Sequence, residues 1–178
     1  SLATLSFDKR RSDFFTNELL ILLKLIDKKI IDKEILFGSW AGAFGNFQFM
    51  PSTIKNYAVD SDNDNKINLK SINDSFESAA NYLNKIGWKK NEPCFFKINL
   101  KNNVPINLLN TSAQKIKNKR KLKKLKNYII NYEEISSYEN KKVAIITPDK
   151  DIVPEADPLK PAYIVFDNYE LILKWNRS

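Results

Sequence analysis

The stretch GSWAGAFGNFQFMPS, residues 38–52, carries no charge in a 178-residue chain that is 28% charged. It holds three of the chain's four glycines and four aromatic residues: Trp40, Phe44, Phe47 and Phe49. Glycines let a backbone pass close to a partner, and flat apolar rings stack on sugars as readily as on other side chains. The stretch therefore fits either a cleft for a neutral, hydroxyl-rich polymer or a tightly packed helix junction.

An aspartate-rich loop follows at once in VDSDNDNKIN, residues 59–68. Aspartates occupy positions 1, 3 and 5 of a loop that starts at Asp60, and a turning loop points alternate side chains toward one hard cation. Position 6 needs a left-handed backbone, for which Asn65 is the best substitute for glycine. Position 12 is Ser71 where an EF-hand has Glu, but Asp74 at position 15 can close a longer loop. We predict a calcium site here, with an exposed Asx-rich turn as the alternative.

The composition excludes several kinds of chemistry. The chain has no histidine, which removes Ser-His and Cys-His catalysis and His-ligated zinc or iron sites. The single Cys94 cannot form an internal disulfide, and its apolar flanks predict a small buried thiol. No run of about 18 apolar residues is present to span a membrane. The net charge of +8 favours anionic partners, or serves only solubility.

Hydrophobic periodicity predicts a helical lobe followed by a small β-containing lobe. We expect Ser12 to cap the first helix and Ser52 to cap the third. Asp74 and Glu77 have capping-box spacing, and Gly87 stands where a left-handed C-cap belongs. Residues 167–168 fit a hairpin turn. The expected helices are residues 12–31, 32–38, 51–59 and 74–86, the strands are residues 94–100, 143–147, 162–166 and 169–175, and a basic, helical insert spans residues 115–135.

Four stretches together resemble the membrane-bound lytic murein transglycosylase B family, a lysozyme-like branch of the soluble-lytic-transglycosylase-like enzymes. The resemblance covers essentially the whole chain and is weakest over residues 89–160. The stretches are SLATLSFDKRRSDFF, GSWAGAFGNFQFMPSTIKNYAVDSDNDNKINL, SAANYLNKIGW and FDNYELILKWNRS. It implies an α+β, mainly α fold. A lysozyme-like lobe at residues 1–88 would hold an EF-hand-like calcium loop at 60–74, and a small β lobe at 89–178 would return to the cleft at 170–178.

The resemblance also implies an activity. These enzymes cleave the MurNAc-GlcNAc β-1,4 bond of peptidoglycan, and the muramyl C6 hydroxyl attacks to leave a 1,6-anhydro product. One Glu serves as acid and then base, and uncharged walls would keep it protonated. The implied sugar-binding residues are Ser39, Gln48, Tyr82, Trp175 and Asn176, and the implied calcium ligands are Asp60, Asp62, Asp64, the Lys66 carbonyl and Asp74.

The family's catalytic Glu motif does not occur in these 178 residues. We transfer its role to none of Glu18, Glu34 or Glu77, and we expect the catalytic Glu upstream of Ser1 in a longer enzyme. A non-catalytic, calcium-stabilised wall-binding module is the alternative, and a nucleic-acid binder driven by the basic insert is a third reading without a recognisable motif. The family resemblance predicts a monomeric periplasmic enzyme on peptidoglycan strands, without an organic cofactor, associated with the outer membrane through an upstream segment.

Overall fold

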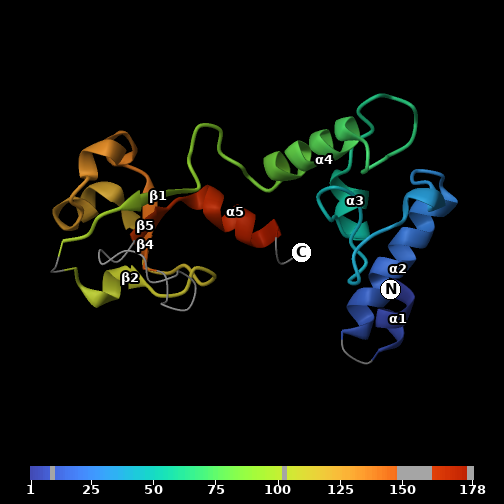
Figure 1. The fold of residues 1–178 in the computed structure, drawn as a ribbon, viewed down its shortest axis with the longest axis horizontal. Helices are drawn as coiled ribbons and strands as arrows, with labels where there is room; N and C mark the ends of the chain where they lie inside the picture. Colours follow the sequence, from blue (N-terminus) through green and yellow to red (C-terminus); the bar gives the residue numbers. More distant parts are fainter. Residues whose placement is uncertain (9–10, 102–103, 148–161, 176–178) are drawn as a thin grey trace. The chain divides into compact units, whose positions relative to one another are not determined.

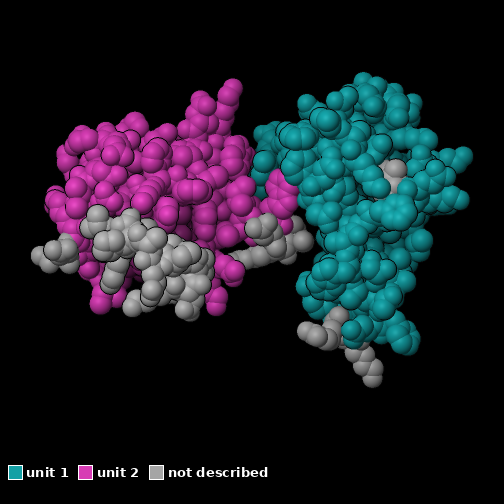
Figure 2. All heavy atoms as spheres, in the orientation of Figure 1, with its two compact units in different colours: residues 1–87, 178 teal, residues 88–177 magenta. Residues whose placement is uncertain are grey.

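The computed structural model describes residues 1–8, 11–101, 104–147 and 162–175. Its chain divides into two units, residues 1–87 and residues 88–177 (Figure 2). The first unit is helical, and the second is built on a mixed sheet, so the predicted α+β, mainly α class is confirmed (Figure 1). None of the described helices is long and apolar enough to cross a bilayer.

The first unit contains four α-helices and one turn of 3₁₀-helix. The second helix ends at Asp27, and Lys29, two residues later, has the left-handed conformation with φ 58°. The Ile30 N–H then bonds to the Leu25 carbonyl, which closes the helix with a Schellman pattern. This helix is therefore four residues shorter than predicted. The elements are α1 (Leu2–Phe7), α2 (Ser12–Asp27), η1 (Lys33–Ile35), α3 (Pro51–Tyr57) and α4 (Ile72–Lys85).

The three predicted N-caps were wrong. Arg11, not Ser12, is the N-cap of α2, and Met50, not Ser52, is the N-cap of α3. Helix α4 begins earlier than expected, because the Ser71 hydroxyl accepts a hydrogen bond from the Asp74 N–H at 3.2 Å. Asp74 therefore occupies the first turn of the helix rather than its cap.

The buried face of α4 is made largely of small and polar side chains. Phe76 is 60% exposed, whereas Ser75 and Ser78 are 1% and 0% exposed. The helix turns its small, polar side toward residues 57–61, and Ser78 Oγ accepts from the Val59 N–H at 2.9 Å. Small hydroxyl-bearing residues allow this close approach and satisfy the loop's backbone groups. At the other end, Gly87 has φ +103°, as predicted for the C-cap.

The second unit is a five-stranded sheet with short 3₁₀ helices and one α-helix. The strand order is β1-β5-β4-β2, and β3 pairs with β4 from outside this path. The pair β2–β4 is parallel, and the pairs β1–β5, β4–β5 and β3–β4 are antiparallel. The elements are β1 (Phe95–Ile98), η2 (Ile106–Leu108), β2 (Leu109–Asn110), β3 (Arg120–Lys121), η3 (Leu122–Tyr128), η4 (Tyr132–Tyr138), β4 (Lys142–Ile146), β5 (Ala162–Val165) and α5 (Asp167–Trp175).

Alternate residues of β4 face two different cores. Val143 and Ile145 pack with Leu122, Leu125 and other buried residues of η3 and η4. Ala144 and Ile146 lie on the opposite side of the sheet. The basic insert is therefore part of a core, in 3₁₀ rather than α-helical form. Cys94 is half-buried rather than fully buried, and burial raises the pKa of its thiol.

The last predicted strand is the helix α5, and the predicted hairpin turn at residues 167–168 is its first turn. Alternating apolar residues suggested a strand, but Asp167 and Glu170 place two acids near a helix N-terminus, where the dipole favours them. Asn168 is fully buried and bonds back to the loop before β1. Its Oδ1 accepts from the Lys89 N–H at 2.9 Å, and its Nδ2 donates to the Lys89 and Glu92 carbonyls.

We predict that Asn168→Ala destabilises the second unit by about 2–4 kcal/mol, because three backbone groups, among them the buried Glu92 carbonyl, lose their partner. Urea unfolding followed by far-UV circular dichroism measures this. Asn140→Ala is the matched control, since Asn140 is exposed and its side chain donates to the adjacent Glu139. Equal unfolding midpoints for the two variants would contradict the assigned role of Asn168.

Candidate functional site

The uncharged stretch folds into two successive turns on either side of Phe44. Phe44 bridges Gly38 in one direction and Phe49 in the other. The Ser39 N–H donates to the Ala43 carbonyl at 2.8 Å, and Phe44 and Phe49 exchange two backbone hydrogen bonds at 2.8 Å each. These pairings satisfy the backbone where the stretch is buried.

The glycines of this stretch bring the backbone against the protein's own atoms. A Cβ at Gly38 would clash with the Ala43 carbonyl oxygen, and one at Gly42 would clash with the Leu2 side chain. Gly45 lies against Leu69 and has φ +74°, a conformation that side chains rarely adopt. At these positions the packed-junction interpretation is correct, and the glycines are explained without a ligand.

The aromatic residues divide between core and surface. Phe44 and Phe49 are 8% and 3% exposed, and they belong to the core. Phe47 packs edge-on against Phe76, with ring centroids 5.1 Å apart. Trp40 is 81% exposed and presents its indole ring to solvent. Of the four rings predicted to line a cleft, Trp40 is therefore the one most available to a ligand.

Ser39 and Gln48 lie in the two turns, one before and one after Phe44. Ser39 is partly exposed, and its Oγ accepts from the Ala43 N–H at 3.2 Å. Gln48 is exposed with φ 54°, and its Nε2 donates to the Gly45 carbonyl at 2.9 Å. Both side chains are thus oriented by the turn that contains them.

Tyr82 lies in the core between α3 and α4. It is 6% exposed, and its ring packs against Tyr57 and Phe49 with centroid distances of 4.9 and 5.7 Å. Phe49 therefore connects Tyr82 to the turn that carries Gln48. Trp175 is the last residue of α5 in the second unit and is half-buried. Asn176 lies outside the described residues.

Glu18 is a site residue that the sequence analysis did not assign. Its side chain lies in α2, is 2% exposed, and accepts a hydrogen bond from the Ser52 N–H at 2.8 Å. The Glu18 carboxylate thus bonds a backbone N–H in the first turn of α3, where a negative charge is favoured. Met50 precedes Pro51 and has no oxygen to cap this helix. The absence of a capping side chain at Met50 was the sequence signal that another residue supplies the hydrogen-bond acceptor for this helix.

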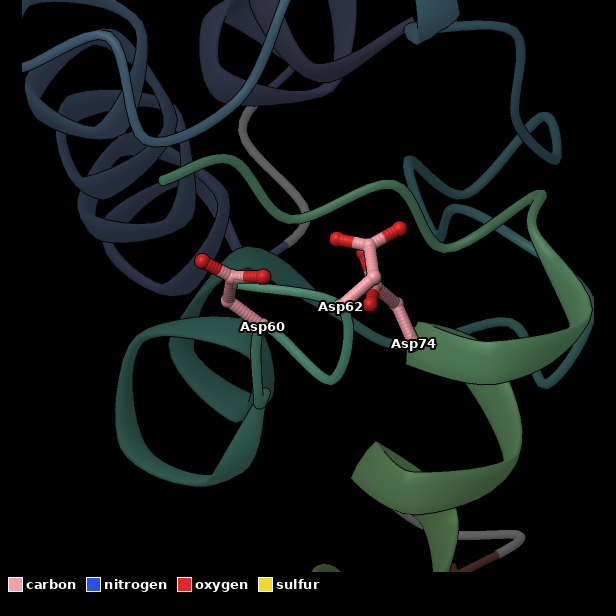
Figure 3. A group of neighbouring side chains, drawn as sticks. All are labelled: Asp60, Asp62 and Asp74. Atoms are coloured by element: carbon pink, nitrogen blue, oxygen red, sulfur yellow. The ribbon is translucent and has the colours of Figure 1, made fainter. Parts of the chain in front are cut away.

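The acidic loop brings three of the four predicted carboxylates together. One oxygen from each of Asp60, Asp62 and Asp74 lies within 4.8 Å of the others. Figure 3 draws these three side chains. Asp74 is 1% exposed and accepts from the Ser61 N–H at 2.9 Å and the Asn68 N–H at 2.7 Å. Asp64 is not among these three, and its Oδ1 accepts from the Lys66 N–H at 2.8 Å.

The backbone of the loop has the predicted left-handed residue. Asn65 has φ 68°, and its N–H donates to Asp60 Oδ2 at 2.8 Å. The Lys66 side chain turns away to pair with Asp32 at 2.9 Å, so that only its backbone can serve a cation in the loop. Partial desolvation and the charges of Asp64 and Asp74 raise the pKa of Asp62. Carboxylate oxygens on a turning loop fit a hard cation such as calcium.

The acidic loop and the uncharged stretch are joined directly. The Asn46 N–H donates to the Leu69 carbonyl at 2.9 Å, at the position where Gly45 contacts the same residue. Asn46 Nδ2 also donates to Ser75 Oγ in α4 at 3.1 Å. The turn that holds Gln48 is therefore hydrogen-bonded to the segment that follows the aspartates and to α4.

A family model described as the transglycosylase SLT domain matches residues 1–178. The chain belongs to this family. A curated relative of this SLT domain is the membrane-bound lytic murein transglycosylase B of Escherichia coli (strain K12). It is 45% identical over 93 residues, which cover 52% of this chain and 26% of the relative.

Solved structures match nearly all of this SLT domain. SltB3 from Pseudomonas aeruginosa in complex with NAG-NAM-pentapeptide has a TM-score of 0.78 and 28% identity, and the match covers 99% of this chain and 46% of that one. The Escherichia coli lytic transglycosylase Slt35 in complex with calcium has a TM-score of 0.69 and 28% identity, covering 99% and 53%. The chain spans about half the length of these solved relatives. The matches confirm the predicted lysozyme-like fold.

Removing the Glu18 carboxylate should lower the free energy of unfolding of the SLT domain's first unit. We predict that Glu18→Ala costs about 2–4 kcal/mol, because it leaves a cavity and an unpaired helix N–H. Glu18→Gln keeps an acceptor oxygen and should cost about half as much. Guanidinium unfolding measures both variants, with the exposed Glu77→Gln as control. Unchanged stability in Glu18→Ala would contradict the role of this carboxylate.

Proposed function

We propose that this protein is a peptidoglycan lytic transglycosylase, which cleaves the MurNAc-GlcNAc β-1,4 bond and forms a 1,6-anhydromuramyl product. The observation that carries the proposal is the match of the SLT family model to residues 1–178. SltB3, a relative with TM-scores of 0.78 and 0.82 in two complexes, was solved with NAG-NAM-pentapeptide and with NAG-anhNAM-pentapeptide. The second ligand has the anhydro form expected of the product.

Residues 38–49 would form one wall of the sugar site. The Ser39 hydroxyl and the Gln48 amide offer neutral hydrogen-bonding groups, which suit acetamido and hydroxyl groups of amino sugars. The exposed ring of Trp40 offers a flat surface for a sugar to stack on. Tyr82 would support this wall from behind through Phe49. Trp175 and Asn176 remain proposed sugar-binding residues of the second unit.

The acid–base Glu is proposed to precede Ser1. Among the described carboxylates of the first unit, Glu18 and Asp74 are buried and bonded to backbone N–H groups. These two act as structural acceptors, and neither is assigned to catalysis. The same observation favours a second candidate function, a calcium-stabilised module that binds peptidoglycan without cleaving it.

The proposed location is the periplasm, where murein is accessible, with association to the outer membrane. The curated relative's name describes it as membrane-bound, and this supports the proposal. We propose that the protein acts as a monomer without an organic cofactor.

A digestion assay separates the two candidate functions. The full-length gene product should release 1,6-anhydromuropeptides from purified sacculi, as detected by mass spectrometry. Gln48→Asn should lower kcat/KM by roughly 10- to 100-fold, because the shorter amide no longer reaches the sugar. Asn tolerates the left-handed backbone of this position, so the turn should survive. Gln114→Ala, in the second unit, is the control.

Three outcomes of the assay are informative. Anhydro products support the transglycosylase. Sedimentation with sacculi without any product supports the binding module and contradicts the enzyme. A folded protein that neither binds nor digests sacculi contradicts both candidate functions.

We further propose that the loop binds structural calcium through Asp60, Asp62, Asp64, the Lys66 carbonyl and Asp74. The convergence of three carboxylates and the left-handed Asn65 support this, as does the relative Slt35, which was solved with calcium. Bound calcium would offset the repulsion between the carboxylates and hold the loop against Gly45.

Calcium should raise the melting temperature by about 5 °C or more relative to chelator. Asp60→Asn should abolish this difference, whereas Asp27→Asn on the exposed end of α2 should not. The pKa of Asp62 is raised, so protons compete with calcium as the pH falls. The calcium effect should therefore fade at a pH above that at which an ordinary aspartate titrates. Equal melting temperatures with calcium and chelator at neutral pH would show that the loop is an Asx-rich turn and not a calcium site.

A further inference from the structure

Residues 115–126, KIKNKRKLKKLK, contain eight cationic residues and no acid. The structure places the second half of this run in β3 and η3. Leu122 and Leu125 are 0% and 2% exposed and belong to the core of the second unit. In a 3₁₀-helix residues three apart lie on the same side, so the two leucines fix which lysines face outward. Lys121, Lys123, Lys124 and Lys126 are all exposed.

These lysines are held on a rigid base. The Leu122 N–H donates to the Lys141 carbonyl and the Lys123 N–H donates to the Glu139 carbonyl, both at 2.9 Å. Lys121 also lies opposite Lys142 in the antiparallel β3–β4 pair. Like charges at opposed positions of a ladder are destabilising. We name Lys121, Lys123, Lys124, Lys126 and Lys142 the basic face.

Little negative charge balances the basic face within the described residues. Among the cations of residues 115–126, Lys119 is the one that forms ion pairs within the described residues, with Asp167 at 2.8 Å and Glu170 at 2.7 Å. Lys119 therefore has a structural role. Lys141, beside the basic face, pairs with Glu92 at 2.9 Å. The carboxylate of Glu139 accepts from Asn140, and Glu133 and Glu134 lie exposed on η4. Five lysines thus face solvent with three acids nearby.

An exposed apolar side chain follows the basic run in the sequence. Ile130 is 63% exposed and comes two residues after the end of η3. Its N–H donates to the Asn99 carbonyl at 2.8 Å, and the neighbouring Lys101 N–H donates to the Tyr128 carbonyl at 3.0 Å. These bonds hold the backbone around Ile130 against residues 99–101, four residues after Lys126. A basic surface with an apolar tip is typical of proteins that lie on membranes.

We propose that the basic face binds the surface of a membrane that contains anionic lipids. Each lysine near such a surface adds electrostatic attraction that requires no specific geometry. Flexible ammonium groups suit this kind of binding, whereas bidentate recognition requires a fixed geometry. Nucleic acid is less well matched, because Tyr128 and Tyr132 are half-buried and buried and offer no open stacking surface. The proposal is independent of peptidoglycan cleavage.

Vesicle sedimentation tests the proposal. The protein should bind vesicles containing phosphatidylglycerol and not vesicles of phosphatidylcholine alone, and salt should weaken the binding. The triple variant Lys121→Gln, Lys123→Gln, Lys124→Gln should lose roughly a hundredfold in partitioning. Its melting temperature should not fall, because the change relieves repulsion with Lys142. Ile130→Ser should also weaken binding.

A second triple variant, Lys24→Gln, Lys28→Gln, Lys85→Gln, removes the same charge from exposed positions of the first unit. It should retain most of the binding. Equal losses in the two triple variants would show that net charge alone acts, and would overturn the proposal. The proposal also fails if the parent protein binds both vesicle types equally, or if the first triple variant loses affinity for duplex RNA or sacculi but not for the anionic vesicles.

Discussion

Three glycines allow the backbone of residues 38–50 to run in contact with the Ala43 carbonyl, Leu2 and Leu69. A side chain at Gly42 or Gly45 would push the stretch away from Leu2 or Leu69, and one at Gly38 would disrupt its turn against Ala43. Because the stretch is also cross-bridged at Phe44, its two turns have little freedom. A ligand that meets them finds groups already in place, which lowers the entropy cost of binding.

The same contacts explain why an acidic loop follows an uncharged stretch. Leu69 belongs to the segment just after the aspartates, and its carbonyl accepts the Asn46 N–H. Asp74 anchors this segment through two backbone hydrogen bonds and is itself part of α4. A cation in the loop would therefore stiffen the turn that carries Gln48 without touching the ligand. The charged side chains are confined to the acidic loop, and the turns of residues 38–50 carry none.

Much of this architecture was predictable from sequence, since it depends on local patterns. The left-handed Asn65, the C-cap at Gly87 and three of the four predicted strands follow from residue type and alternation. The errors occurred where contacts between residues far apart in the sequence determine the local structure. The N-terminus of α3 receives an acceptor from Glu18, and α5 is fixed by Asn168, whose partners lie 76–79 residues away. Periodicity in a short window does not contain that information.

The candidate site was predicted in part for the same reason. The pattern of aspartates predicted that carboxylates would converge, but not that Asp64 would turn toward Lys66 instead. The aromatic residues all looked equivalent in the sequence, whereas Phe44 and Phe49 are core residues and Trp40 is exposed. Burial depends on which side of each turn faces the core, and a run of uncharged residues without periodicity does not specify it.

We propose that the turns on either side of Phe44 form a preorganised surface for amino sugars. The decisive measurement is an NMR titration of the isotopically labelled protein with N-acetylglucosamine-containing muramyl oligosaccharides. We expect saturable shifts at the Ser39 amide, the Trp40 indole and the Gln48 side-chain amide, with Asn140 unmoved. A folded protein in which these three signals stay fixed at saturating sugar would contradict it.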